Sequence, residues 1–284
     1  LNRAMHGTVD APLRFFKTLS KHLIEVIGLT QCLSEPCLFF TKDKEGKLTL
    51  TVVTFVDDNL IAGTRRCVDN FKKDIQQHFN IKDLGPLKKH LGLWCEWKVD
   101  EHGERCLVAT MPKMAQEIID DFRKHTGYDA KISKTPATPG SSLLKGEEET
   151  KMQLEHMSMV GKLMHLITKI LGECSNAVRE LAKFFQGPGA THWTALEKLV
   201  GHMKHIQGDI KLACGKPKEL RVINYVDSNF GANKDNRKSI TGMQCSLGGT
   251  ITGWASRTQK SVTLSSTEAE HVALTTCCQD ARYV

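Results

Sequence analysis

The stretch that decides the fold is Thr49-Leu-Thr-Val-Val-Thr-Phe-Val-Asp57-Asp58-Asn-Leu-Ile-Ala-Gly63, in which two adjacent carboxylates interrupt a β-branched and apolar run. It predicts a hairpin whose first strand ends near Phe55 and whose tight turn carries the acids. Like charges side by side are costly unless a cation offsets them, and carboxylate oxygens suit Mg²⁺ or Mn²⁺. The alternative is a solvated turn, since Asp is a common turn residue.

Size and composition predict an ordinary globular protein of about two domains, with 284 residues, 40% of them hydrophobic and 25% charged. The formal net charge of +7 suits a polyanionic partner without requiring one. The ten cysteines include no Cys-x-x-Cys pair, so we expect reduced thiols in an intracellular protein and no zinc site. We find no signal peptide and no apolar run that could span a bilayer, which predicts a protein that is neither secreted nor in a membrane.

Helical and strand patterns alternate over the first part of the chain. A stretch rich in Pro and Gly at 135–142, followed by the charged run 146–150, then predicts a mobile linker. Trp193 follows His192 at the head of a later helix, and we expect it in core packing rather than base stacking. Helical spacing occurs at 12–27, 68–79, 114–125, 152–171, 176–185 and 194–206, and strand patterns occur at 37–40, 48–55, 60–62, 88–98 and 106–108.

The last portion contains a second pair of acids. A strand over 221–228 delivers Asp227, strands at 239–245 and 250–256 follow, and a helix begins after Ser265. Ser265 and Glu268 fit a capping box, which gives Glu268 a structural role. Glu270 lies about 200° further round the helix, beside an apolar stripe, and is the better candidate for a metal ligand. The alternative for Asp227 is a strand-end residue that makes a local turn. The stripe is Ala269, Ala273 and Leu274.

Short motifs in a fixed order resemble the Pol polyprotein of copia-type long-terminal-repeat retrotransposons along nearly the whole chain. The resemblance implies an α+β fold with a reverse transcriptase palm and thumb over 1–140, without the fingers and first palm strand. A linker and helical connection over 141–218 and the first half of a ribonuclease H-like fold over 219–284 would follow. The motifs lie at 1–7 with 11–12, 35–39, 55–58, 81–85, 90–92, 135–136, 159–165, 192–193, 225–227, 237–242 and 265–270.

The resemblance also implies an activity: RNA-directed DNA synthesis coupled to ribonuclease H, both by two-metal phosphoryl transfer with Mg²⁺ or Mn²⁺. Asp57 and Asp58 would be catalytic metal ligands of the polymerase, and Asp227 and Glu270 those of the nuclease. The expected partners are an RNA template, a DNA primer, an RNA–DNA hybrid and dNTPs, in a cytoplasmic element particle or the nucleus.

The hairpin from 88 onward resembles the primer grip of the family. Lys88 and Lys89 would lie near phosphates, and Leu91 and Gly92 would let a nucleic-acid backbone approach closely. The alternative is a solvated hairpin whose lysines protect an edge. Asp10 occupies a position that in the family touches the incoming nucleotide.

Departures from the family pattern leave two hypotheses open. Asp10 replaces a Gln, Val9 a Lys and Phe55 a Tyr, and 170–173 lacks the usual Arg-Pro-Asp. The family's remaining metal ligands would lie before residue 1 and after residue 284, so we expect little activity from this piece alone. The chain is either a section of an active polymerase and nuclease, or a catalytically inactive remnant, at most a basic nucleic-acid-binding module. An unrelated structural protein would require all these ordered matches to be coincidental.

Overall fold

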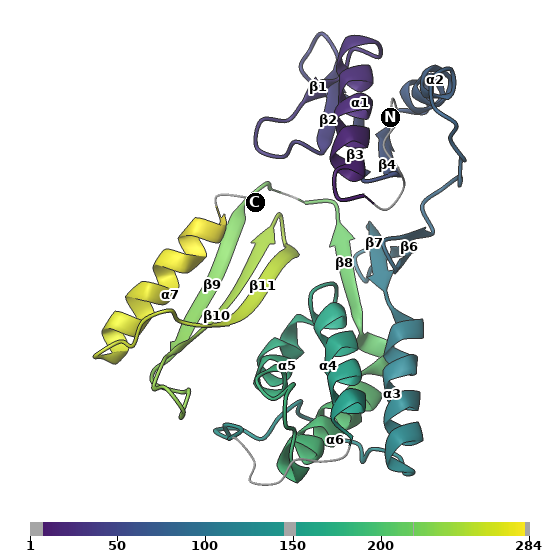
Figure 1. Cartoon of the computed structure of the whole chain (residues 1–284). Helices are drawn as coiled ribbons and strands as arrows, with labels where there is room; N and C mark the ends of the chain where they lie inside the picture. Colours follow the sequence, from purple (N-terminus) through teal and green to yellow (C-terminus); the bar gives the residue numbers. More distant parts are fainter. Residues whose placement is uncertain (1–7, 145–151, 218, 282–284) are drawn as a thin grey trace. The chain divides into compact units, whose positions relative to one another are not determined.

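The computed structural model describes residues 8–144, 152–217 and 219–281 (Figure 1). The predicted motif at 1–7 and the charged run at 146–150 of the predicted linker lie outside these residues, whereas its Pro- and Gly-rich stretch at 135–142 lies within them. The chain forms two compact units, Leu1–Leu87 and Lys88–Val284, and each is described by itself. The boundaries between polymerase, connection and nuclease segments, expected near residues 140 and 218, stay a prediction.

The first unit is an antiparallel four-stranded sheet in the order β1-β2-β3-β4, with two helices on one face. Leu50, Val52 and Thr54 of β3 are buried, whereas Val53 and Phe55 between them are exposed, as the two-residue period of a half-buried strand requires. The elements are α1 (Ala11–Glu25), β1 (Thr30–Gln31), β2 (Leu38–Lys42), β3 (Leu48–Phe55), β4 (Asp58–Gly63) and α2 (Arg65–Gln76).

The helix α2 begins three residues before the predicted start. The Thr64 hydroxyl accepts a hydrogen bond from the Cys67 amide at 3.4 Å and so caps the helix. Phe71 and Ile75 of α2 pack with Leu19 and Leu23 of α1 in one core over the sheet. The helices therefore cover one face and leave the face that carries Phe55 open.

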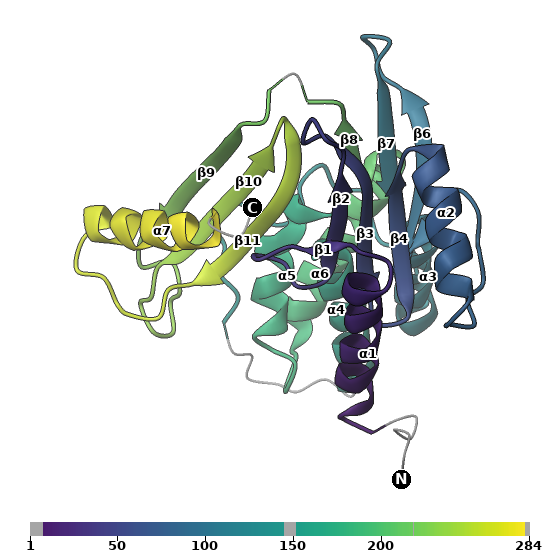
Figure 2. The same ribbon diagram turned by 90° about the horizontal axis from the view of Figure 1, so that it is seen from above.

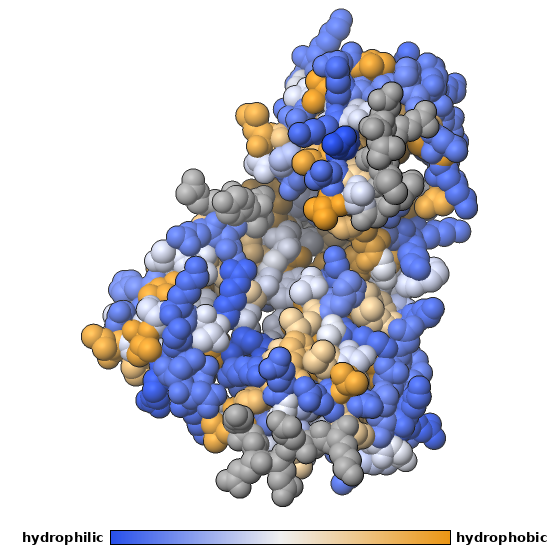
Figure 3. Space-filling view, viewed as in Figure 1, coloured by the Kyte–Doolittle hydropathy of each residue, from blue (hydrophilic) through white to orange (hydrophobic). Residues whose placement is uncertain are grey.

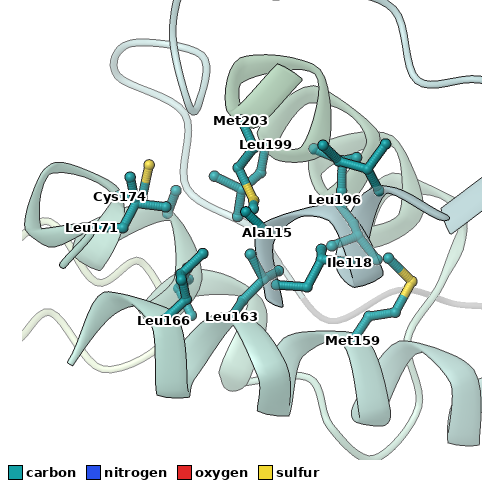
Figure 4. Packing of buried hydrophobic residues seen from close by; sticks show 14 of the residues in the cluster. Ala115, Ile118, Met159, Leu163, Leu166, Leu171, Cys174, Leu196, Leu199 and Met203 are labelled. Atoms are coloured by element: carbon teal, nitrogen blue, oxygen red, sulfur yellow. The ribbon is translucent and has the colours of Figure 1, made fainter. Parts of the chain in front are cut away.

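The second unit begins with another antiparallel four-stranded sheet, in the order β5-β6-β7-β8. Its last strand comes from far along the chain, and the sequence patterns did not predict it. Its helices pack around the largest core, where Ile118 of α3, Leu163 of α4 and Leu199 of α6 point toward one another (Figure 4). The elements are β5 (Lys89–His90), β6 (Leu93–Val99), β7 (Arg105–Thr110), α3 (Pro112–Thr126), α4 (Gln153–Ile167), α5 (Ser175–Ala182), α6 (Ala190–His205) and β8 (Lys211–Gly215), with short 3₁₀ turns η1 (Gly172–Cys174) and η2 (Gln207–Asp209).

The helix predicted over 152–171 ends earlier, at Ile167. There the Ile167 carbonyl accepts a hydrogen bond from the Trp254 indole nitrogen at 2.6 Å. The chain then turns through Gly172, where an added Cβ would lie 2.7 Å from the Trp254 ring. A residue 87 positions away in sequence thus occupies the space in which the helix would continue.

The remainder of the second unit is the antiparallel sheet β11-β10-β9 with α7 along one face (Figures 1 and 2). The predicted order of three strands and a helix is present, and its assignment to a ribonuclease H-like fold stays a prediction. The buried residues of α7 are Ala269, Ala273 and Cys277, while Leu274 is 50% exposed, so its predicted place in the stripe was wrong. The bounds are β9 (Val222–Asn229), β10 (Ile240–Leu247), β11 (Thr250–Thr258) and α7 (Ser266–Ala281).

Hydrophilic side chains cover much of the face seen in Figure 3, with hydrophobic residues scattered among them. None of the helices within the described ranges is long and apolar enough to cross a membrane.

Candidate functional site

The two carboxylates lie at the tip of the β3–β4 hairpin. Phe55 pairs with Asp58, so Val56 and Asp57 form a two-residue turn. Val56 has a φ of 56°, whereas Asp57 has none in the left-handed region. A positive φ at the first position alone is typical of a type II′ turn, where glycine is usual. A β-branched residue there is an outlier, of the kind that clusters at functional sites.

The hairpin register fixes the direction of the second carboxylate. Asp58 lies opposite Phe55 and so faces the side of the sheet that neither α1 nor α2 covers. Asp57 projects from the turn itself, and both carboxylates are exposed. Asn59 turns to the other face, where its Oδ1 is buried without a hydrogen-bond partner in the described chain.

Two exposed carboxylates on one turn fit a magnesium ion. Mg²⁺ keeps several waters and typically binds proteins through one or two carboxylates together with substrate phosphates. Within 8–144, 152–217 and 219–281, no three His, Cys, Asp or Glu side chains come together as a metal cluster. The turn therefore presents two accessible carboxylates without a closed metal cage among the described residues, and metal binding by Asp57 and Asp58 stays a prediction.

The predicted nucleic-acid contacts of the β5–β6 hairpin lie together at one turn. Leu91 and Gly92 connect the strands with φ values of 48° and 85°, the signature of a type I′ turn. Lys88, Lys89 and Gly92 are exposed and Leu91 is half-buried. The geometry presents a basic, accessible turn, and the binding role of its residues stays a prediction.

Asp10 belongs to the first unit. It is exposed at the amino end of α1, and its side chain makes no capping hydrogen bond. Its predicted contact with a nucleotide is untested.

The second pair of acids lies where α7 meets β9. Glu270 Oε1 accepts hydrogen bonds from the Ser228 hydroxyl at 2.7 Å and the Ser228 amide at 3.2 Å. The register of β9 with β10 is unbroken, so Asp227 and Ser228 point to opposite faces of the strand. The structure thus brings Glu270 to the residue next to Asp227, and a shared metal ion remains a prediction.

Glu268 has the structural role that the capping box predicts. The Ser265 hydroxyl accepts from the Glu268 amide at 3.1 Å, and the Glu268 carboxylate accepts from the Leu264 amide at 2.6 Å. The capping box predicts that this carboxylate accepts from the Ser265 amide, and the structure instead shows the amide of the preceding residue, Leu264, as the donor.

Asp227 borders a cleft of about 530 Å³ between the start of α5 and the sheet. Ser256 lines this cleft and accepts a hydrogen bond from Arg179, which also donates to the Thr258 hydroxyl, at 3.2 Å each. Glu180 is buried between Arg179 and Lys183, at 2.6 and 2.7 Å. Sequence patterns could not reveal this network, because Ser256 and Thr258 lie 77 and 79 positions from Arg179 in the sequence. Other polar residues of the cleft are Glu173, Asn176, Lys211, Asn229 and Gln244.

The β3–β4 hairpin lies within a segment that matches a known protein family. Residues 1–132 match the family model described as reverse transcriptase (RNA-dependent DNA polymerase). The chain is 29% identical over 283 residues to the retrovirus-related Pol polyprotein from transposon TNT 1-94 of Nicotiana tabacum, covering 97% of this chain and 21% of that protein. It is 27% identical over 289 residues to the corresponding polyprotein from transposon RE1 of Arabidopsis thaliana, covering 100% of this chain and 19% of that protein.

A shorter match carries less weight. Over 126 residues the chain is 30% identical to secreted RxLR effector protein 161 of Plasmopara viticola, covering 44% of this chain and 88% of that protein. The transposon relatives span the chain almost completely, although the chain spans only about a fifth of their length.

The paired-carboxylate hairpin and the family model together define a reverse transcriptase domain in the first 132 residues. Residues 1–132 thus belong to the reverse transcriptase family, and the chain is similar over nearly its full length to Pol polyproteins of copia-type retrotransposons.

Proposed function

We propose that this chain contributes to an RNA-directed DNA polymerase with an associated ribonuclease H, both working by two-metal phosphoryl transfer. The observation that carries the proposal is the placement of Asp57 and Asp58 at an accessible, strained hairpin turn in a reverse transcriptase domain. Its substrates would be dNTPs, a DNA primer, an RNA template and an RNA–DNA hybrid. An intracellular location, in an element particle or the nucleus, belongs to the same proposal.

In polymerisation, Asp57 and Asp58 would hold Mg²⁺ or Mn²⁺ where primer and nucleotide meet. When bound, the metal would lower the pKa of the primer 3′ hydroxyl and neutralise the charge of the triphosphate. The fixed turn keeps the two carboxylates in place so that no reorganisation is needed during the reaction. Lys88, Lys89 and the Leu91–Gly92 turn would position the nucleic-acid backbone, and Asp10 would face the incoming nucleotide.

In hybrid cleavage, Asp227 and Glu270 would hold metal beside the scissile phosphate. The two hydrogen bonds from Ser228 fix the Glu270 carboxylate against β9. For both acids to share one ion, the Asp227 carboxylate has to turn around the strand edge toward Glu270. In the described part of the chain β9 is an edge strand, which leaves that path open.

Primer extension by a Pol polyprotein that contains these 284 residues tests the polymerase. We expect Mg²⁺-dependent extension that Asp57→Asn or Asp58→Asn reduces by at least about a hundredfold, which is the scale of losing one electrostatic contact to the transition state. Glu45→Gln, in the exposed turn before β3, removes a similar charge and should leave extension unchanged. Extension that survives both Asp changes would reject the assignment.

Metal binding can be tested without activity. In the 284-residue chain, Mn²⁺ should broaden the amide NMR signals of Asp57 and Asp58 before those of Glu45, and Asp57→Asn should remove the effect. Metal and nucleic-acid binding without any extension by the polyprotein would instead support the catalytically inactive binding module.

A further inference from the structure

One face of the sheet β5-β6-β7-β8 carries an exposed tryptophan between two lysines. The strand registers pair Lys89 with Trp94, Trp94 with Thr110, and Thr110 with Lys211. Directly opposed residues share a face, so these four side chains form one row across the sheet. With strands about 4.8 Å apart, the backbones of the two lysines are about 14 Å apart.

The indole of Trp94 is held but not covered. It is 47% exposed, although a buried position is usual for so large an apolar group. The Lys89 ammonium lies 5.6 Å from the ring centroid, within the range of a cation–π contact. An aromatic ring that is fixed in this way and remains accessible can accept a flat ligand by stacking.

Charge on this face favours a polyanionic ligand. Glu96 pairs with Lys98 at 3.2 Å and Asp209 pairs with Lys211 at 3.2 Å, whereas Lys89 has no ion-pair partner within the described residues. Lys89 carries an unpaired charge at one end of the row, and at the other end a phosphate would replace the exposed Asp209 as the partner of Lys211, so two phosphates of one strand could be contacted while a base between them lies on the indole.

Trp97 offers a natural comparison on the same strand. It is 56% exposed and has the Arg105 guanidinium 5.1 Å from its ring, but it points to the opposite face of β6. The turn next to Arg105 carries three carboxylates, Asp100, Glu101 and Glu104. Exposure and a stacked cation are therefore shared by both tryptophans, which differ in the face of the sheet they occupy and in the charge around them.

From this difference we infer that Trp94 is a stacking site for an unpaired nucleobase, with Lys89 and Lys211 contacting the flanking phosphates. The ligand class is single-stranded nucleic acid. Any of the bases can stack on the indole, because each has an aromatic face. The inference deepens the proposed function and rests on it. In the proposed function the turn of this hairpin contacts only the nucleic-acid backbone, and the inference adds a contact between Trp94 and a base.

Fluorescence anisotropy with a labelled 20-nucleotide oligothymidylate and with the same strand in a blunt duplex tests the inference on the full chain. Trp94→Ala should weaken single-strand binding by about tenfold, the scale of one lost base stack. Duplex binding should change less than twofold, because paired bases are not available for stacking. Trp94→Phe, which keeps an aromatic ring, should recover most of the affinity.

Trp97→Ala is the matched control and should leave both affinities within twofold, and circular dichroism would verify that each variant is folded. Lys89→Gln and Lys211→Gln should each lower the slope of log affinity against log salt by about 0.7 for the single strand. Two results would overturn the stacking site alone. One is an equal loss of single-strand affinity in Trp94→Ala and Trp97→Ala. The other is a Trp94→Ala variant that binds the single strand as tightly as the parent chain. Failure of the parent chain to bind either probe would overturn the nucleic-acid part of the proposed function as well.

Discussion

Acidification should destabilise the second unit through one buried histidine on α4. His156 is 0% exposed, and neither ring nitrogen has a hydrogen-bond partner within the described chain. Its ring instead meets the edge of Trp193, with centroids 5.7 Å apart. Burial, together with the charge of nearby His192, lowers the pKa of His156 from 6.5 to about 4. The folded protein therefore holds this imidazole neutral at a pH where the unfolded chain protonates it.

The sign and size of the effect follow from that difference in pKa. Since the folded pKa lies below the unfolded value, the unfolded state binds the proton first, and stability falls as the pH drops from 6.5 toward 4. One pKa unit corresponds to about 1.4 kcal/mol, so lowering the pH from 7 to 5 should cost about 2 kcal/mol of unfolding free energy. Such a loss is a large share of the roughly 5–15 kcal/mol that stabilises a typical domain.

Urea unfolding followed by circular dichroism at pH 7 and pH 5 measures this loss. His156→Leu removes the titrating ring and should lower the pH dependence by about 2 kcal/mol, leaving the part that comes from His22 and His192, whose pKa is also lowered by burial. His165→Leu, at an exposed position near the end of the same helix, should retain the full dependence. The window stops at pH 5 so that carboxylates contribute little. An unchanged pH dependence in His156→Leu would show that the buried imidazole is not the cause.

Three further changes test other features of the structure. Gly172→Ala would place a Cβ 2.7 Å from the Trp254 ring, so we expect a loss of about 1–3 kcal/mol by denaturant unfolding, and a neutral effect would contradict that packing. Val56→Gly relieves a φ of 56° at an exposed site and should be neutral or stabilising by up to about 1 kcal/mol, so a clear loss in the same assay would argue against the strained turn. Burial raises the pKa of the Cys174 thiol to about 12, so a thiol reagent at pH 8 should label exposed Cys214 well before Cys174, as peptide mass spectrometry can determine.

Local patterns predicted the hairpin and the helices well. The expected strand over 48–55 coincides with β3, and the expected return strand over 60–62 lies within β4. Trp193 packs against the core, as expected from its place at the head of a helix. These features depend on alternation, helical spacing and turn chemistry within a few residues, which a single sequence contains.

The features that the sequence did not predict depend on distant partners. The strand β8 is short and mostly exposed, and it is a strand because β7 pairs with it. Similarly, α4 ends where Trp254 arrives, and Leu274 is exposed because the sheet contacts Ala269, Ala273 and Cys277 instead. For the site, the positions of the four acids on a turn, a strand and a helix were predictable, whereas the opposite directions of Asp227 and Ser228 required the strand register.

The late arrival of β8 has a consequence for how the protein is made. Thr110 of β7 leaves the ribosome about a hundred residues before its partner Lys211, and the four helices of the main core, α3, α4, α5 and α6, are synthesised in between. Until then the growing chain exposes an unsatisfied strand edge, which is a template for pairing with other molecules. Premature termination just before Lys211 should therefore yield an aggregation-prone product, although nearly all of that core would already have been translated.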